Sequence, residues 1–104
     1  KIETEKEITI GNFSMNVEER TATLNGEEIS LTVREFDILF KLLSFPNKIF
    51  TRIQIMDEIW GVDSEVGWET VTVHIARLRK RFEGWEEFSI ESIRGVGYKA
   101  VKKV

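Results

Sequence analysis

The spacing of the apolar residues changes at Thr32, and this change limits the folds that the chain can adopt. Before it, apolar and polar residues alternate, as at Phe13 and Met15, which is the period of a β-strand with one buried face. From Phe36 to Leu43, apolar residues recur every three or four positions, which is the period of an α-helix. Strands followed by helices predict an α+β domain, in which the sheet and the helices are grouped separately.

The first 31 residues predict an antiparallel sheet of about four short strands. One turn is expected at Gly11-Asn12, between two segments of alternating polarity. Another is expected at Asn25-Gly26, between residues 21–24 and 28–31, because Asn-Gly strongly favours a tight hairpin turn. The sheet therefore consists of hairpins between strands that are neighbours in sequence.

Two capping boxes mark the starts of the first two helices. Thr32 and Glu35 begin the first helix, which is predicted to end near residue 44, before the only proline. Thr51 and Gln54 begin the second helix, which ends at Gly61. We expect the second helix to pack through an apolar stripe of Ile53, Met56, Ile59 and Trp60.

A third helix is predicted from residue 69 or 70 to about residue 82, after a loop over 61–68 that Trp68 anchors. Its apolar residues form one narrow stripe of Val71, Ile75, Leu78 and Phe82. At about 100° per residue, the opposite side carries Thr70, Val73, His74, Arg77, Lys80 and Arg81. This helix therefore has one face for a core and one for solvent or a partner.

The end of the chain predicts a β-hairpin. Residues 88–93 and 99–104 are its strands, and Arg94-Gly95-Val96-Gly97 forms the bend. A sheet, three helices and a hairpin are the layout of a winged helix, in which helices two and three form a helix-turn-helix and the hairpin is the wing. A chain of 104 residues has room for one such domain, so residues 1–104 are predicted to be a single winged-helix domain.

Composition argues against several classes of function. The chain has no cysteine and one histidine, so neither a disulfide framework, nor a metal site, nor a cofactor is expected. No nucleophile is placed by a base, so no catalytic residue is predicted and the protein is not expected to be an enzyme. There is neither a long apolar run nor a visible signal peptide, which predicts a cytoplasmic protein without a membrane span.

The net charge of −3 argues mildly against a polyanionic partner, but the charge is unevenly distributed. The first 31 residues hold three bases and seven acids, whereas residues 69–104 hold eight bases and five acids. Four of these bases lie within five positions: Arg77, Arg79, Lys80 and Arg81. Such a patch matters more for association than the net charge does.

The third helix has the two faces that a DNA-recognition helix needs. Arg77, near the centre of the polar face, can fork onto a guanine edge, and Val73 can touch a thymine methyl group. Thr70 and His74 can donate to phosphates. The alternative is an ordinary solvated amphipathic helix with a basic face, which is the commoner case for such a helix taken alone.

The hairpin shifts this balance toward DNA. An arginine such as Arg94 on a thin, glycine-containing ribbon can enter a narrow, electronegative minor groove, although a plain turn with a solvated arginine is the alternative. Tyr98 either hydrogen-bonds a phosphate or packs on the core. Trp60 is either buried or donates its indole N–H to a phosphate. Arg52 either reaches a phosphate or stands in solvent on the first turn of its helix.

Five segments match one known family in order and spacing. They are Leu31-Thr32-Val33-Arg34-Glu35-Phe36, Thr51-Arg52, Ile59-Trp60-Gly61, Thr70-Val71-Thr72-Val73-His74-Ile75-Ala76-Arg77-Leu78-Arg79-Lys80 and Ile93-Arg94-Gly95-Val96-Gly97-Tyr98. Together they resemble the DNA-binding effector domain of OmpR/PhoB-type response regulators, from about residue 8 to residue 100.

The resemblance implies a bacterial transcription factor that binds double-stranded DNA sequence-specifically, with helix 69–82 in the major groove and wing 90–100 in the adjacent minor groove. The implied phosphate contacts are Arg52, Trp60, Thr70, His74, Arg79 and Tyr98. Arg77 and Val73 face bases, and Arg94 enters the minor groove with Ser92 beside it. Thr72 and Lys80 complete the predicted DNA-binding residues.

The resemblance also implies partners. The family binds tandem DNA half-sites as a head-to-tail dimer and meets RNA polymerase through the loop at 61–68. Its N-terminal sheet meets a receiver domain, which this chain lacks, and a cognate sensor histidine kinase acts on the full-length protein.

Three positions depart from the family pattern. The family often has Arg where this chain has Glu69, Asp at Thr72, and a basic residue at Ala76. Glu69 suits a helix N-terminus but would repel a nearby phosphate, so DNA binding should be weaker and less salt-sensitive than in a fully basic relative. The acidic N-terminal sheet favours an alternative function, a winged-helix protein-interaction module without useful DNA affinity.

Overall fold

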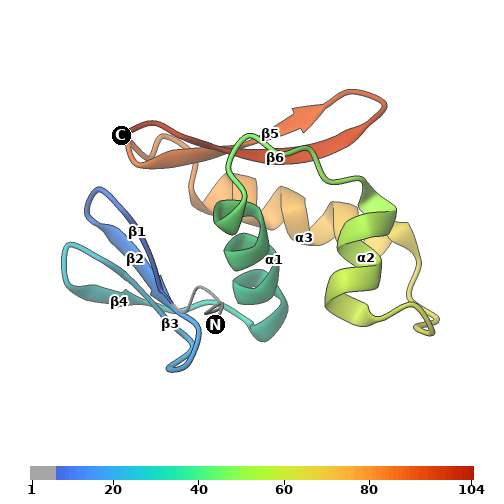
Figure 1. Cartoon of the computed structure of the whole chain (residues 1–104), viewed down its shortest axis with the longest axis horizontal. Coiled ribbons are helices and arrows are strands. Elements are labelled where there is room, and N and C mark those ends of the chain that lie inside the picture. Colours follow the sequence, from blue (N-terminus) through green and yellow to red (C-terminus); the bar gives the residue numbers. More distant parts are fainter. Residues whose placement is uncertain (1–6) are drawn as a thin grey trace, which may run out of the picture.

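The computed structural model describes residues 7–104 and has the predicted order of a sheet, three helices and a hairpin (Figure 1). The first four strands are β1 (Glu7–Ile10), β2 (Phe13–Asn16), β3 (Thr21–Leu24) and β4 (Glu27–Ile29). They form one antiparallel sheet in the order β1-β2-β3-β4, so each strand pairs with its neighbour in sequence. The predicted sheet is therefore confirmed.

The turn between β3 and β4 has the geometry that its dipeptide favours. The φ angle is 54° at Asn25 and 83° at Gly26. Positive φ at both central residues is the property of the type I′ turn, whose twist matches that of the two strands. Leu24 pairs with Glu27 across the turn, which confirms the predicted hairpin.

The helices are α1 (Val33–Ser44), α2 (Arg52–Trp60) and α3 (Trp68–Arg81). Both predicted capping boxes are present, at Thr32 and Thr51. In each, the threonine hydroxyl accepts from the amide three residues on, and that residue's side chain accepts from the threonine amide, over 2.8–3.2 Å. The prediction that Trp68 lies in the loop is wrong, because α3 already begins there, after an N-cap glycine without a side-chain signal.

The first capping box yields a stability prediction. Thr32→Ala is expected to lower the free energy of unfolding by about 1 kcal/mol, because it removes the acceptor for an otherwise unpaired amide. Thr32 is exposed, so little packing is lost. Urea unfolding followed by circular dichroism measures the loss. Thr32→Ser keeps the hydroxyl and should stay close to wild type, and equal stability of both variants would show that the cap contributes nothing.

The apolar stripe of α2 differs from the prediction, whereas that of α3 agrees with it. Ile55 is 2% exposed and Ile53 is 53% exposed. Ile55 is the buried residue of α2, and Met56, Ile59 and Trp60 are half-buried against the core. Including Ile53 was therefore wrong. The predicted stripe of α3 is confirmed, since it is at most 3% exposed at Val71, Ile75, Leu78 and Phe82.

The C-terminal hairpin consists of β5 (Phe88–Ile93) and β6 (Gly97–Lys102), joined by residues 94–96, which we call the wing tip. A third segment pairs with β6. The amide of Phe50 donates to the carbonyl of Tyr98 at 2.8 Å, and the amide of Tyr98 donates back to Phe50 at 2.9 Å. These bonds tie the hairpin to the connection between α1 and α2.

The two glycines near the bend have different roles. Gly95 lies in the wing tip, with φ at 76°, whereas Gly97 is the first residue of β6 and pairs with Ile93. A Cβ atom added at Gly97 would overlap the carbonyl oxygen of Phe50 and lie 2.9 Å from Cα of Thr51. The prediction that both glycines serve the bend is therefore wrong for Gly97, where the absence of a side chain admits the backbone of Phe50.

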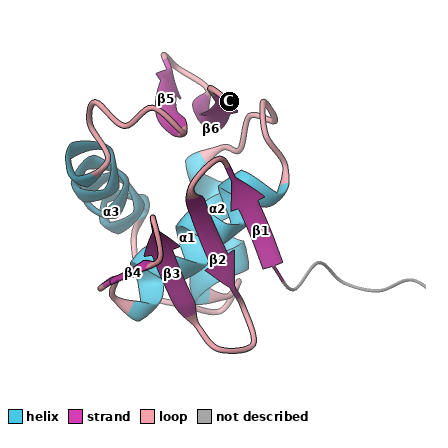
Figure 2. Cartoon of the chain, turned by 90° about the vertical axis from the view of Figure 1, so that its left-hand side faces the viewer, coloured by secondary structure: helices cyan, strands magenta, loops and turns pink. Residues whose placement is uncertain are grey.

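The core lies between the sheet, the helices and the hairpin. Figure 2 shows the four-stranded sheet in front of α1, with the hairpin above and α3 to one side. Four aromatic rings join these layers: Phe13 of β2, Phe82 and Trp85 after α3, and Phe88 of β5, with centroids 4.5–6.2 Å apart. The end of α3 and the base of the hairpin are thereby fixed to the sheet.

Candidate nucleic-acid interface

The side of α3 that faces away from the core exposes basic side chains. Four exposed bases lie on α3: Arg77, Arg79, Lys80 and Arg81. Within the part of the chain that the structure describes, none of them forms an ion pair with a carboxylate. Val73 stands among them with 48% of its surface exposed. This side of α3 therefore offers free positive charge and the apolar side chain of Val73 to an external partner.

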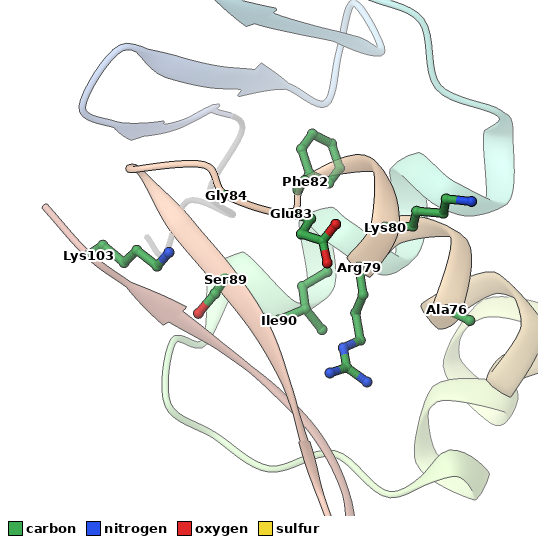
Figure 3. Close-up of a pocket in the computed structure, with 9 residues that line it drawn as sticks. All are labelled: Ala76, Arg79, Lys80, Phe82, Glu83, Gly84, Ser89, Ile90 and Lys103. Atoms are coloured by element: carbon green, nitrogen blue, oxygen red, sulfur yellow. The ribbon is translucent and has the colours of Figure 1, made fainter.

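Two adjacent basic side chains of α3, Arg79 and Lys80, point in different directions. A pocket of about 410 Å³ lies between the end of α3 and the base of the hairpin, and both Arg79 and Lys80 contribute to its rim. Figure 3 shows Arg79 extending from α3 toward β5, whereas Lys80 points away from it. Arg79 thus occupies the wing side of α3, and Lys80 the outer side.

Trp60 is held between two helices. Arg34 donates from Nη1 to the Ile59 carbonyl at 2.7 Å, and its guanidinium lies 5.2 Å from the centroid of the Trp60 ring. On α3, the His74 ring meets Trp60 edge-on, with centroids 5.2 Å apart. Trp60 is half-buried, so it packs between helices and keeps part of its ring accessible. The sequence analysis missed Arg34, whose contact with a carbonyl 25 residues away leaves no local pattern.

The orientation of His74 is fixed by α3 itself. Nδ1 lies 2.8 Å from the carbonyl oxygen of Thr70, and because a carbonyl only accepts, Nδ1 carries the proton. A neutral ring then offers an acceptor at Nε2, so only the doubly protonated ring can donate to a phosphate. Thr70, Thr72 and His74 are all half-buried, at the edges of the exposed side.

The hairpin carries three other predicted site residues, Ser92, Arg94 and Tyr98, and lies close to Arg52 at the start of α2. Figure 1 shows the wing tip at the same end of the molecule as the start of α2. Arg94 and Ser92 are exposed, whereas Tyr98 is 8% exposed, which favours the interpretation that its ring packs on the core. A small pocket of about 50 Å³ is lined by Arg52, Ser92 and Tyr98 together with Gly95 and Val96 of the wing tip. The fold thus brings the start of α2 beside the wing.

Arg52 also contacts α3. Its guanidinium carbon lies 4.6 Å from the centroid of the Trp68 indole, a cation–π geometry. Both side chains are exposed, Trp68 by 45%. The stack joins the first residue of α2 to the first residue of α3. The sequence analysis expected Trp68 only to anchor its loop.

Among residues 7–104, no three His, Asp or Glu side chains are grouped as a metal ion would require. No helix in the same range combines the length and apolar character needed to cross a bilayer.

The arrangement of the exposed bases suits a charged, grooved partner. A cationic helix and an arginine-tipped ribbon can neutralise phosphates and reach the floor of two adjacent grooves.

Comparison with known proteins places the chain among transcriptional regulators. The family model described as "Transcriptional regulatory protein, C terminal" matches residues 26–100. The heme response regulator HssR of Staphylococcus aureus is 40% identical over 104 residues. That match covers 99% of this chain and 46% of HssR, so the chain spans just under half the length of the curated relatives that it matches.

Solved structures have the same fold. The DNA-binding domain of Klebsiella pneumoniae RstA, in complex with the RstA box, superposes with a TM-score of 0.77 at 27% identity, over 93% of this chain and 98% of that one. Response regulator DrrB of Thermotoga maritima, an OmpR/PhoB homolog, also gives 0.77, at 26% identity, over 93% of this chain and 45% of that one. The predicted winged-helix fold is confirmed.

Proposed function

The chain belongs to the family of C-terminal domains of transcriptional regulatory proteins, and on this basis we propose that it binds double-stranded DNA sequence-specifically. It is the effector domain of an OmpR/PhoB-type two-component response regulator. In this proposal α3 enters the major groove, and the wing, residues 90–100, enters the adjacent minor groove. The family is one of regulatory domains, and we assign no enzymatic reaction to the chain.

One observation carries the proposal: among residues 7–104, the exposed side of α3 holds four bases without a carboxylate partner, and the exposed Arg94 lies at the wing tip. Charges that are already paired within a protein gain little from a phosphate, whereas free ones release counterions from the duplex on binding. The net charge of −3 does not oppose this, because bases outnumber acids by eight to five over residues 69–104, whereas acids outnumber bases by seven to three in the first 31 residues.

The proposed contacts start from the exposed side chains of α3 and the wing. Arg77 forks onto a guanine edge, Val73 touches a thymine methyl group, and Arg94 enters the minor groove beside Ser92. The proposed phosphate contacts are Arg52, Arg79 and Lys80, with Trp60, Thr70, Thr72, His74 and Tyr98 at the margins of the interface. Tyr98 can take part only through the small exposed fraction of its side chain.

Arg77→Ala tests direct readout. We expect it to weaken binding by about 1–3 kcal/mol on the preferred duplex and to relax base choice, because the bidentate contact is lost. The preferred duplex is first selected from random genomic fragments. Affinity is then measured by fluorescence anisotropy on that duplex and on single-base variants, at several salt concentrations.

Two further variants separate charge from readout. Arg77→Lys keeps the charge but not the fork, so it should keep the salt dependence and lose base choice. Lys80→Ala should weaken binding equally on every duplex and lower the slope of log affinity against log salt by about one. If Arg77→Ala matches wild type on all duplexes, Arg77 does not read bases.

The acidic sheet favours the second candidate function, a protein-interaction module. If the wild-type domain shows no measurable affinity for any duplex at low salt, yet binds a protein through the sheet or α3, that function is supported and DNA binding is overturned.

Further partners belong to the full-length protein. We propose a dimer on tandem half-sites, contact with RNA polymerase through the loop at 61–68, and contact of the N-terminal sheet with a receiver domain. A sensor histidine kinase would act on that receiver domain, in the cytoplasm. The loop at 61–68 supports the polymerase contact, because Val62 is 76% exposed and Asp63 and Glu65 are exposed acids.

A further inference from the structure

We infer that Trp68 is a positioning residue of the duplex interface, which holds Arg52 where it meets a backbone phosphate. The inference rests on the proposed function and adds a residue to it. Its starting point is the stack in which the Arg52 guanidinium carbon lies 4.6 Å from the centroid of the Trp68 indole.

The place of the stack supports this role. Arg52 is the first residue of α2 and lines the small pocket beneath the wing tip, together with Ser92 and Tyr98. Trp68 is the first residue of α3. The guanidinium therefore stands between the two elements proposed to enter adjacent grooves, where the phosphates that separate the grooves must pass.

The exposure of the pair also needs an explanation. A tryptophan usually buries most of its surface, yet 45% of Trp68 is exposed, and its indole lies against the guanidinium of Arg52. A free arginine side chain loses considerable conformational entropy when it is fixed on a phosphate. The indole face restrains the guanidinium before binding and leaves its N–H groups free to donate, because the cation–π contact uses the flat face.

The local charge supports the same conclusion. Glu69 would repel a phosphate, but its carboxylate is turned back toward Gly67 at the start of α3, where a side chain on Gly67 would overlap it. At a helix N-terminus a carboxylate is stabilised by the unpaired amides. Arg52 then supplies a positive charge at this end of α3, and Trp68 determines where that charge lies.

A double-mutant cycle tests the inference. Trp68→Ala should weaken binding to the preferred duplex by about threefold to tenfold, and Trp68→Leu, which keeps an apolar side chain without a π face, should do the same. Trp68→Phe keeps an aromatic face and should retain most of the affinity. Arg52→Ala should lower the salt slope by about one, and adding Trp68→Ala to it should cause little further loss.

The controls make the failure of the inference distinct from that of the proposed function. Val62→Ala removes another exposed apolar side chain near α3 and should leave DNA affinity unchanged. If the wild-type domain binds the preferred duplex and both Trp68→Ala and Trp68→Leu bind it with the same affinity, Trp68 does not position Arg52. Fully additive losses in the double variant would lead to the same conclusion. In both cases the proposed function would stand. A wild-type domain that binds no duplex would overturn the proposed function and this inference together.

Discussion

Replacing Phe13 by alanine is expected to lower the free energy of unfolding by about 3–5 kcal/mol, because a fully buried aromatic ring is removed and the cavity cannot close. Phe13 is 0% exposed and contacts the rings of Phe82, Trp85 and Phe88, with centroids 6.2, 5.5 and 5.1 Å away. These neighbours come from the end of α3 and the hairpin, so the ring of one sheet residue supports both proposed DNA-contacting elements. A domain of this size is stable by only about 5–15 kcal/mol, so the loss is a large fraction.

Urea unfolding followed by tryptophan fluorescence and by circular dichroism measures this effect. Phe13→Leu fills most of the volume and should cost clearly less than the alanine variant. Phe45→Ala is the matched control, because Phe45 is 46% exposed and should lose less than about 1 kcal/mol. If Phe13→Ala and Phe45→Ala have similar midpoints, the aromatic cluster does not hold the domain together.

Gly97→Ala is expected to cost about 3 kcal/mol or more, because the new methyl group overlaps main-chain atoms that have no room to move. The added Cβ would collide with the Phe50 carbonyl and lie 2.9 Å from Cα of Thr51. Relief requires separating Phe50 from Tyr98, whose two backbone hydrogen bonds measure 2.8 and 2.9 Å. We therefore expect the wing to detach from the segment that precedes α2.

Amide hydrogen exchange gives the specific measurement. The amides of Phe50 and Tyr98 should lose protection in Gly97→Ala, together with a lower urea midpoint. Gly95→Ala is the control within the same hairpin, because nothing lies within 4 Å of its added Cβ and only its φ of 76° is strained. It should cost about 1–2 kcal/mol, less than Gly97→Ala, and leave both amides protected. Retained protection in Gly97→Ala would contradict the close contact.

The predictions from sequence succeeded where a short segment contains its own physical cause. A threonine with Glu or Gln three residues later closes a capping box within one turn, and an Asn-Gly pair adopts the φ angles of its hairpin turn, both independently of distant residues. The same holds for the stripe of Val71, Ile75 and Leu78, which fixes the side of α3 that faces the core.

The errors arose where a boundary or a face depends on packing. Helix α3 starts at Trp68 without a side-chain cap, so no residue type marks its first turn. Ile53 and Ile55 are chemically alike, and only the angle at which α2 packs on α1 and α3 buries Ile55 and exposes Ile53. The local sequence places Gly97 in the bend, because no local pattern indicates that Phe50, which is 47 residues earlier in the chain, packs against it.

The amino-acid sequence by itself determined the order of the elements, the turn and cap geometries, and the basic face of α3, because period, φ preference and charge are properties of short segments. Only the tertiary structure decided how Arg34 and His74 pack against Trp60, how Arg52 comes to lie on Trp68 beneath the wing tip, and how Phe50 joins the hairpin. Such contacts depend on the packing of whole elements around one core, so residues far apart in sequence meet at positions that no single segment specifies.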